Sequence, residues 1–145
     1  MNLIIDVGNT RVKVAVFEQD IIVELQIFDK KRILSEVKKI SKKYHITDAI
    51  ISSVASISLK DIKKIEEIVP LTLVSSTIKT PFQNLYSTPK TLGVDRIALV
   101  FGAIIKYPKQ NILIIDAGTC ITFDFVNKQK EYLGGAISPG IEMRY

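Results

Sequence analysis

Apolar residues at the start of the chain follow the period of β-strands. Residues 3–5 form a short apolar run, and apolar side chains alternate with other residues in 11–17 and again in 21–28. Alternation of this kind is typical of a strand that buries one face. Three strands are therefore predicted before any helix.

Further along the chain, apolar residues recur at helical spacing. Residues 33–44 are predicted to form an amphipathic helix, 49–54 a strand, and 94–107 a second long helix. Residues 75–93 contain prolines, glycine and polar side chains, which predict a long irregular loop. The residues expected on the buried side of the 94–107 helix are Ile97, Ala98, Phe101, Ile104 and Ile105.

A short helix is expected between these segments. Ser58 and Asp61 form a capping arrangement, since a hydroxyl can accept a free backbone N–H and a carboxylate favours the positive end of a helix. The helix should include Ile68, and Pro70 should end it before a strand at 71–74. The resulting order, three strands, helix, strand, helix, strand, matches the ribonuclease-H-like unit.

An internal repeat links the two ends of the chain. Residues 4–10 read Ile-Ile-Asp-Val-Gly-Asn-Thr and residues 114–119 read Ile-Ile-Asp-Ala-Gly-Thr. In each copy we expect a buried apolar strand, an aspartate at its carboxyl end, a glycine turn, and a hydroxyl residue before an alternating strand. A repeat of this kind decides how the whole fold is interpreted.

The repeated pattern suits a phosphate group. Glycine lets backbone N–H groups approach an anion, threonine adds a hydroxyl donor, and aspartate can hold Mg²⁺ directly or through water. A single copy is equally well explained as a tight β-hairpin, in which Asp and Gly are common turn formers. Two copies favour two related half-domains that hold a polyphosphate from opposite sides.

The repeat also sets the expected domain organisation. We predict an α/β, ribonuclease-H-like (actin-like ATPase) fold, with a mixed five-stranded sheet and flanking helices, followed by the start of a duplicated second half. Residues 1–110 would form the first half-domain, including the loop and the linking helix, and residues 111–145 the beginning of the second. The remainder of the second half is expected to be missing from the sequence.

Composition narrows the function classes. With 47% hydrophobic and 24% charged residues, the chain is expected to fold as an ordinary globular domain. The net charge of +5 raises the question of nucleic acid, but the lysines lie at helical spacing and are expected on solvated outer faces, so no nucleic-acid partner is predicted. No apolar stretch approaches the length of a membrane span, which is about 20 residues, and no signal sequence is found, so a cytoplasmic protein without a membrane partner is expected.

Four motifs in order carry a family resemblance. They are residues 6–13 (Asp-Val-Gly-Asn-Thr-Arg-Val-Lys), 93–96 (Gly-Val-Asp-Arg), 116–122 (Asp-Ala-Gly-Thr-Cys-Ile-Thr) and 134–140 (Gly-Gly-Ala-Ile-Ser-Pro-Gly). With these motifs the chain resembles type III pantothenate kinase over essentially its whole length. The first and third motifs are shared with the wider actin-like superfamily, whereas the second and fourth narrow the match.

The resemblance implies an activity. The family transfers phosphate from ATP to the primary hydroxyl of pantothenate, giving 4'-phosphopantothenate in the first step of coenzyme A biosynthesis. It implies Mg²⁺, a monovalent cation (K⁺ or NH₄⁺) and a homodimer. Because the family's C-terminal portion is missing, the 145 residues alone are expected to be inactive.

The resemblance also implies site residues. Asp95 would be the general base, since deprotonating an alcohol requires a carboxylate within hydrogen-bond reach. The implied substrate-binding residues are Tyr86, Gly93, Val94, Asp95 and Arg96. The implied nucleotide-binding residues are Asp6, Val7, Gly8, Asn9, Thr10, Lys13, Gly118, Thr119 and Thr122. The implied metal ligands are Asp6 and Asp116.

Each of these residues has an alternative explanation. Asp95 could serve only the helix macrodipole, and Arg96 could form a structural salt bridge instead of binding the substrate carboxylate. Tyr86 could be a packed aromatic of the loop, and Lys13 an exposed strand lysine. The glycines at 134 and 135 could mark a bulge rather than a close approach to substrate.

Two other functions remain open at this point. A ribonuclease-H-like nuclease also uses carboxylates at strand ends, to hold metals on a nucleic-acid backbone. A non-catalytic nucleotide-binding or transcriptional accessory protein of the same family is the second alternative. Intact Asp6, Asp95 and Asp116 favour the kinase, since a binding role would not need all three.

Overall fold

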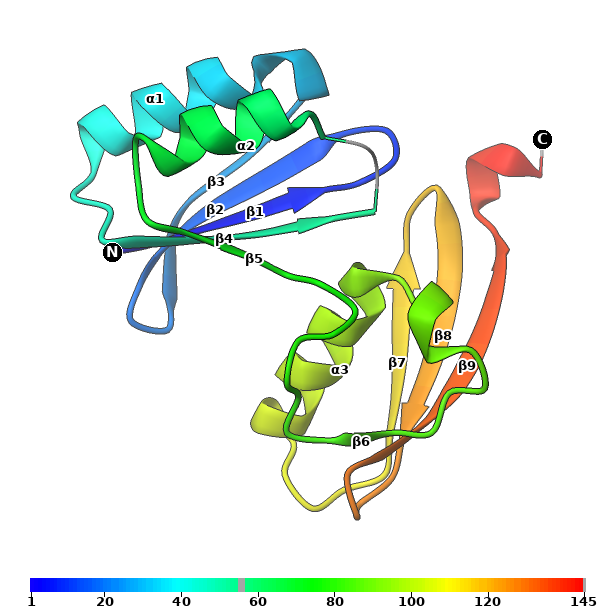
Figure 1. The fold of residues 1–145 in the computed structure, drawn as a ribbon. Coiled ribbons are helices and arrows are strands. Elements are labelled where there is room, and N and C mark those ends of the chain that lie inside the picture. Colours follow the sequence, from blue (N-terminus) through cyan, green and yellow to red (C-terminus); the bar gives the residue numbers. More distant parts are fainter. Residues whose placement is uncertain (55–56, 145) are drawn as a thin grey trace. The chain divides into compact units, whose positions relative to one another are not determined.

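The computed structural model describes residues 1–54 and 57–144, and the chain divides into two compact units. Unit 1 comprises Met1–Val74 and unit 2 comprises Ser75–Tyr145. Figure 1 shows the elements of each. The predicted boundary between residues 110 and 111 separates the two halves of the proposed duplication, and not two compact units. It stays a prediction.

Unit 1 is a mixed sheet with two helices on one face (Figure 1). The strand order is β3-β2-β1-β4-β5, in which β1 pairs antiparallel with β2 and parallel with β4. The predicted five-stranded α/β arrangement is therefore confirmed. Its elements are β1 (Asn2–Val7), β2 (Val12–Glu18), β3 (Ile21–Phe28), a 3₁₀ turn (Lys30–Arg32), α1 (Ile33–Lys43), β4 (Asp48–Ser53), α2 (Leu59–Glu66) and β5 (Leu71–Leu73).

Strand alternation builds the core of unit 1. Every second residue of β1 and β2 is almost completely buried and packs with the apolar faces of α1 and α2. The intervening residues, Asp6 and Lys13 among them, lie on the opposite face of the sheet. The best-buried residues of the core are Leu3, Ile5, Val12, Val16, Val37 and Ile65.

The predicted cap of α2 is present, although the helix is shorter than expected. Ser58 is the N-cap residue, and its hydroxyl accepts the Asp61 amide at 3.0 Å. The helix ends at Glu66, so Ile68 lies outside it. The Ile68 amide bonds to the carbonyl of Ile65, three residues back, because the chain tightens before Pro70.

Unit 2 is a four-stranded sheet with one long helix. The strand order is β6-β9-β8-β7, and among the described residues β7 has a hydrogen-bonded neighbour on one side only. The long loop contains the two-residue strand β6, which pairs parallel with β9. The elements are β6 (Gln83–Asn84), a 3₁₀ turn (Pro89–Thr91), α3 (Val94–Lys106), β7 (Ile112–Ala117), β8 (Cys120–Val126), β9 (Glu131–Pro139) and a 3₁₀ turn (Ile141–Met143).

Two burial predictions for unit 2 are only partly confirmed. Of the residues expected on the buried side of α3, Ile97 and Ile104 are buried, whereas Ala98, Phe101 and Ile105 are exposed. The helix also buries Arg96 and Val100. Strand β7 is not buried on both faces either, since Leu113 and Ile115 are 59% and 58% exposed. Helix α3 covers one face of this sheet, but both α3 and β7 carry apolar residues on two sides. The apolar residues on the sides that do not face each other are therefore exposed.

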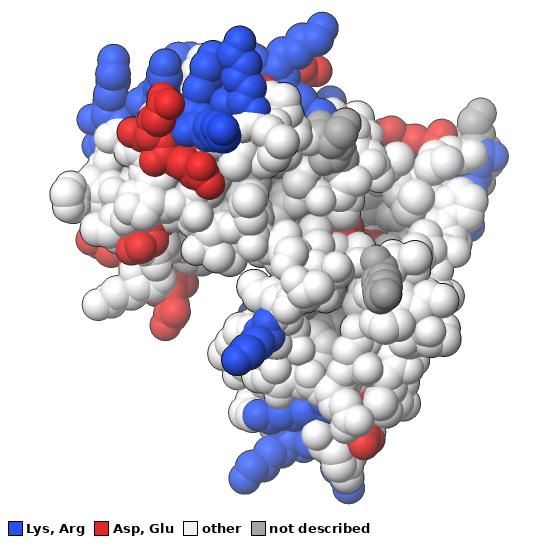
Figure 2. Space-filling view, viewed as in Figure 1, with Lys and Arg blue, Asp and Glu red and all other residues white. Residues whose placement is uncertain are grey.

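Basic side chains gather on the outer faces of α1 and α2, as Figure 2 shows. Lys38, Lys42, Lys60, Lys63 and Lys64 are all exposed, which confirms the prediction that these lysines are solvated. Among residues 1–54 and 57–144, no helix combines the length and apolar character needed to cross a bilayer.

Candidate functional site

The first glycine turn follows β1 and places Asp6 between two polar neighbours. Asp6 faces Lys13 across the β1–β2 register and Ser52 across the β1–β4 register. The Ser52 hydroxyl donates to the Asp6 carboxylate at 3.1 Å. The aspartate is only partly buried, so its carboxylate stays accessible at the carboxyl end of a rigid strand.

The turn itself is closed by its own backbone. The Gly8 amide donates to the Arg11 carbonyl at 3.1 Å, so this amide already has a partner. Lys30, from the 3₁₀ turn that follows β3, donates to the Asn9 carbonyl at 2.6 Å. The structure thus adds a cation to this turn that sequence reasoning missed, because Lys30 is 21 residues away in the chain.

The second glycine turn follows β7 and is also closed by a bond from its glycine amide. The Gly118 amide donates to the Cys120 carbonyl at 2.9 Å. Asp116 faces Thr122 across the β7–β8 register. The Thr122 hydroxyl is buried and has no hydrogen-bond partner among the described residues, an arrangement that is costly unless a ligand completes it.

Gly140 packs on the second turn. Its amide donates to the Thr119 carbonyl at 2.9 Å, and a Cβ at this position would lie 2.3 Å from the Gly118 carbonyl oxygen. No side chain fits there, so this position requires glycine for a close backbone approach. The motif that contains Pro139 and Gly140 therefore supplies the glycine that packs against the second turn.

Helix α3 begins at the predicted substrate motif. Gly93 is its N-cap, and Val94, Asp95 and Arg96 form its first turn. The Asp95 carboxylate accepts the Arg96 amide at 2.8 Å, which is a helix N-terminal interaction. Asp95 is partly buried, so the same carboxylate remains available to a ligand.

Arg96 points into unit 2 and forms a buried ion pair. Its guanidinium donates to Asp124 through Nε at 3.0 Å and through Nη2 at 2.5 Å. Nη2 also donates to the Tyr132 hydroxyl at 3.0 Å, and that hydroxyl donates to Asp124 at 2.5 Å. All three residues are at most 4% exposed, so the structural salt bridge considered for Arg96 is present.

Burial and the charge of Asp124 have opposite effects on the pKa of Arg96 and the same effect on the pKa of Tyr132. Burial disfavours the charge of Arg96, but the hydrogen bonds and charge of Asp124 outweigh it and raise the pKa of Arg96. Burial raises the pKa of Tyr132, and the bond that its hydroxyl donates to Asp124 raises it further. The guanidinium therefore stays charged and the phenol stays neutral at physiological pH.

Tyr86 lies on this cluster. Its ring stacks on Tyr132 at 6.1 Å and lies over the Arg96 guanidinium at 5.3 Å. A Cβ on Gly134 would lie 2.7 Å from the Tyr86 ring, and Gly134 has a φ of 98°, so glycine is required on both counts. The strand pairing also shifts here, between Phe125 and Val126, so the bulge considered as an alternative explanation for these glycines is present.

Sequence reasoning missed Asp124 and Tyr132. A usable signal was present, because Asp124 interrupts the apolar alternation of β8 at an inward position. A buried charge needs a partner of opposite charge, and Arg96 is on the buried side of α3. This signal indicates that Asp124 needs a partner of opposite charge, but it does not identify which residue that partner is.

The carboxylates suit a metal that is shared with phosphate. Within residues 1–54 and 57–144, no three His, Cys, Asp or Glu side chains gather as a protein-only metal site. Mg²⁺ is commonly held by one or two carboxylates together with substrate phosphates. Asp6 with Ser52 and Asp116 with Thr122 each offer a carboxylate and a hydroxyl, which fits that mode.

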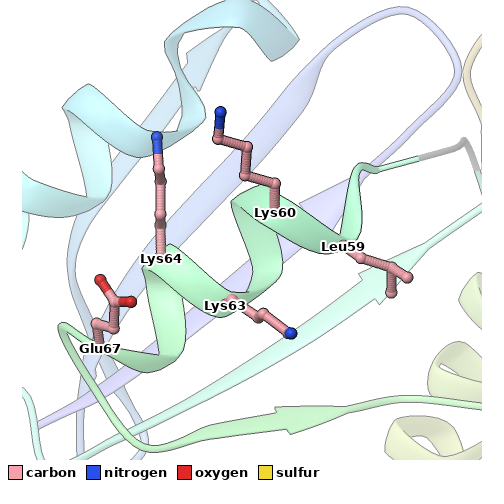
Figure 3. Close-up of a pocket in the computed structure, with 5 residues that line it drawn as sticks. All are labelled: Leu59, Lys60, Lys63, Lys64 and Glu67. Atoms are coloured by element: carbon pink, nitrogen blue, oxygen red, sulfur yellow. The ribbon is translucent and has the colours of Figure 1, made fainter.

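A pocket of about 440 Å³ lies along α2. It is lined by Leu59, Lys60, Lys63, Lys64 and Glu67. Figure 3 shows Lys60 and Lys64 extending from one side of the helix, and Lys63 and Leu59 from another. None of the predicted site residues lines this pocket.

Comparison with known proteins gives a consistent result. Residues 2–145 match the model of the type III pantothenate kinase family. A type III pantothenate kinase of Flavobacterium johnsoniae is 44% identical over 146 residues, covering 100% of this chain and 60% of that protein. The enzyme of the same name from Christiangramia forsetii is 47% identical, with the same coverage. The chain thus spans about 60% of the length of these relatives.

A solved structure supports the fold. A Campylobacter jejuni protein described as a conserved Baf family transcriptional activator superposes with a TM-score of 0.59. It is 22% identical, and the match covers 97% of this chain and 56% of that one. At this identity the likeness concerns the fold alone. Together with the family match, it confirms the predicted ribonuclease-H-like (actin-like ATPase) class.

Proposed function

Because this chain belongs to the type III pantothenate kinase family, we propose that the protein containing these residues transfers phosphate from ATP to the primary hydroxyl of pantothenate. The observation that supports this most directly is the first turn of α3. It places Asp95 at a helix start, where the Arg96 amide fixes its carboxylate, and a fixed carboxylate is what a phosphoryl acceptor site requires. The nuclease and the non-catalytic alternatives lack a comparable supporting observation.

Asp95 acts as the general base in this proposal. Its Oδ1 is held by the Arg96 amide at 2.8 Å, which orients the carboxylate. An ionised carboxylate accepts several hydrogen bonds, so it can also accept the proton of the attacking hydroxyl. Phosphoryl transfer depends mainly on positioning and charge stabilisation, so a fixed carboxylate is more important than a strongly basic one.

The two glycine turns hold the nucleotide phosphates in this proposal. Thr10, Lys13 and Lys30 surround the first turn, and Thr119 and Thr122 the second. Asp6 and Asp116 would hold Mg²⁺ and the associated monovalent cation, K⁺ or NH₄⁺. When bound, these ions would offset the negative charge of the phosphate oxygens.

One backbone observation supports assigning both turns to one role: in each, the glycine amide donates across its own turn. The neighbours of the two aspartates differ, since Asp6 faces Lys13 across its hairpin whereas Asp116 faces Thr122. That both turns act on a single nucleotide stays a prediction. The homodimer and the cytoplasmic location stay predictions as well.

The test is an assay of the full-length protein. We expect ADP formation that depends on pantothenate, and a phosphorylated pantothenate product. Asp95→Asn should fold normally and lose turnover by a factor of about 10²–10⁴, because a positioned base contributes about that much. Asp48→Asn, an exposed aspartate at the start of β4, is the matched control and should retain full activity.

Three results would contradict the proposal. Nucleotide binding without turnover of pantothenate would favour a non-catalytic protein. Metal-dependent cleavage of RNA or DNA would favour the nuclease. An Asp95→Asn variant as active as the unsubstituted enzyme would remove this residue from the mechanism.

A further inference from the structure

The ion pair between Arg96 and Asp124 connects three parts of unit 2 that are distant in sequence. Arg96 belongs to the first turn of α3, Asp124 to the middle of β8 and Tyr132 to β9. The loop residue Tyr86 lies on both Arg96 and Tyr132. One buried cluster thus joins a helix start, two strands and the loop.

The geometry of the guanidinium shows how firmly it is fixed. Asp124 accepts Arg96 Nε with both carboxylate oxygens, at 3.0 and 3.1 Å, and accepts Nη2 with one of them. Tyr132 accepts a further bond from Nη2. Several charge-assisted bonds from one edge of a planar guanidinium leave it little freedom to rotate.

The same arginine also fixes Asp95 through its backbone. The Arg96 amide donates to the Asp95 carboxylate, so the side chain and the amide of one residue connect Asp124 to the candidate base. On the other side, the Arg96 guanidinium and the Tyr132 ring form the surface on which Tyr86 lies. Gly134 leaves the space that the Tyr86 ring occupies.

We propose that Asp124, assisted by Tyr132, is a positioning residue for the acceptor-substrate side of the site: it holds Arg96 so that Tyr86 and Asp95 keep their places. The effect on catalysis rests on the proposed kinase function; the effect on Tyr86 and Asp95 does not. Asp124 is completely buried and touches Arg96 and Tyr132, so it acts through these residues and not on the substrate. Loss of its charge should disturb acceptor binding and turnover while leaving the nucleotide side unchanged.

The experiment compares Asp124→Asn, Tyr132→Phe and Glu36→Gln in the full-length protein. Glu36 of α1 is a matched control, because it is also a buried carboxylate, 4% exposed, and forms ion pairs with Lys39 of the same helix and with Arg32 of the preceding 3₁₀ turn. Thermal melting reports folding for each variant. Amide NMR reports the environments of Tyr86 and Asp95, and steady-state kinetics give kcat and KM for pantothenate and for ATP separately.

We expect Asp124→Asn to lower kcat/KM for pantothenate by about 100-fold, because small displacements of positioned groups cost about that factor. KM for ATP should change by less than about two-fold. The Tyr86 and Asp95 amide signals should shift and exchange faster with solvent. Tyr132→Phe, which keeps the ion pair, should show the same pattern at about ten-fold, and Glu36→Gln should lower only the melting temperature.

Each outcome decides a separate point. If the unsubstituted protein phosphorylates pantothenate and folded Asp124→Asn keeps its kinetics and its Tyr86 and Asp95 signals, the positioning inference is wrong and the kinase proposal stands. If the unsubstituted protein does not phosphorylate pantothenate but the variant shifts both signals, the kinase proposal fails and the positioning of Tyr86 and Asp95 stands. If Asp124→Asn does not fold, Tyr132→Phe decides, and unchanged kinetics and signals in that variant would overturn the inference.

Discussion

The β1–β2 hairpin and the β7–β8 hairpin share the sequence Ile-Ile-Asp-x-Gly and have different surroundings. In both, an aspartate is the second-last residue of the first strand and a glycine amide donates across the turn. Strand β1 has a hydrogen-bonded neighbour on each side and buries Leu3 and Ile5 completely. Strand β7 has one described neighbour and leaves Ile115 58% exposed. The comparison teaches that a repeat specifies local geometry and that burial depends on the surrounding elements.

The largest expected effect tests whether both hairpins serve one reaction. In the full-length protein, Asp6→Asn and Asp116→Asn should each lower kcat/KM for ATP by about 10²–10³-fold, because each removes a carboxylate that, in the proposed function, would hold a cation that offsets the charge of the transferring phosphate. Steady-state kinetics across a range of Mg²⁺ concentrations provide the measurement. A large loss in one variant and none in the other would show that only one hairpin has this role.

The two strands should also respond differently to loss of a core side chain. In the 145-residue chain, Ile5→Ala should lower the free energy of unfolding by about 2–5 kcal/mol, since it leaves a cavity in a completely buried core. Ile115→Ala, at the same place in the repeat, should change it by less than about 0.5 kcal/mol. Urea denaturation measures both. Equal losses would mean that β7 is as buried as β1.

The two units should lose stability at opposite ends of the pH range. Hydrogen bonds from Lys43, and then from Tyr44 and Gln26, lower the pKa of Glu24 to about 2, so unit 1 should lose this contribution as the pH falls from about 4.5 towards 2. The pKa of Tyr132 is raised, so unit 2 should lose stability as the pH rises above the usual tyrosine pKa of about 10.

Absorbance of ionised tyrosine tests the alkaline half of this prediction. The chain has five tyrosines and no tryptophan, so the signal is simple to interpret. One tyrosine should resist ionisation until the protein unfolds, and Tyr132→Phe should abolish that delayed step. Simultaneous ionisation of all the tyrosines in the folded protein would be inconsistent with the buried cluster.

The smallest expected difference concerns the two turn glycines. A Cβ on Gly118 would make an ordinary contact of 3.9 Å, so Gly118→Ala should raise the free energy of unfolding by about 0.4–1 kcal/mol by restricting the unfolded chain. A Cβ on Gly8 would lie 3.2 Å from the Arg11 carbonyl oxygen, which should cancel that gain. Chemical denaturation of both variants measures the difference. A greater gain from Gly8→Ala would reverse this ranking.

Much of the fold followed from local patterns. The alternation in 21–28 predicted β3 with its observed bounds, and the Ser58 cap predicted where α2 begins. Local patterns could not predict β6, because a two-residue strand has no measurable period and exists only through its pairing with β9. They also overstated the burial of Phe101, since an apolar residue on a helix does not specify which neighbour covers it.

The candidate site was also predicted only in part. The glycine turns and the Gly-Val-Asp-Arg motif were predicted because each is contiguous in the sequence. The partners of these residues were not, because Ser52 reaches Asp6 across 46 positions and Asp124 reaches Arg96 across 28. Such pairings arise from strand register and helix docking, which a pattern of single residues does not encode.

The contact between Gly140 and the second turn has a mechanical consequence. The backbone after β9 is hydrogen-bonded to the Thr119 carbonyl and packs too tightly against Gly118 to accommodate a methyl group. A ligand that displaces this turn must therefore also move the 3₁₀ segment Ile141–Met143, which begins directly after Gly140. A ligand-induced shift of the turn would therefore also shift any part of the protein that packs on this 3₁₀ segment.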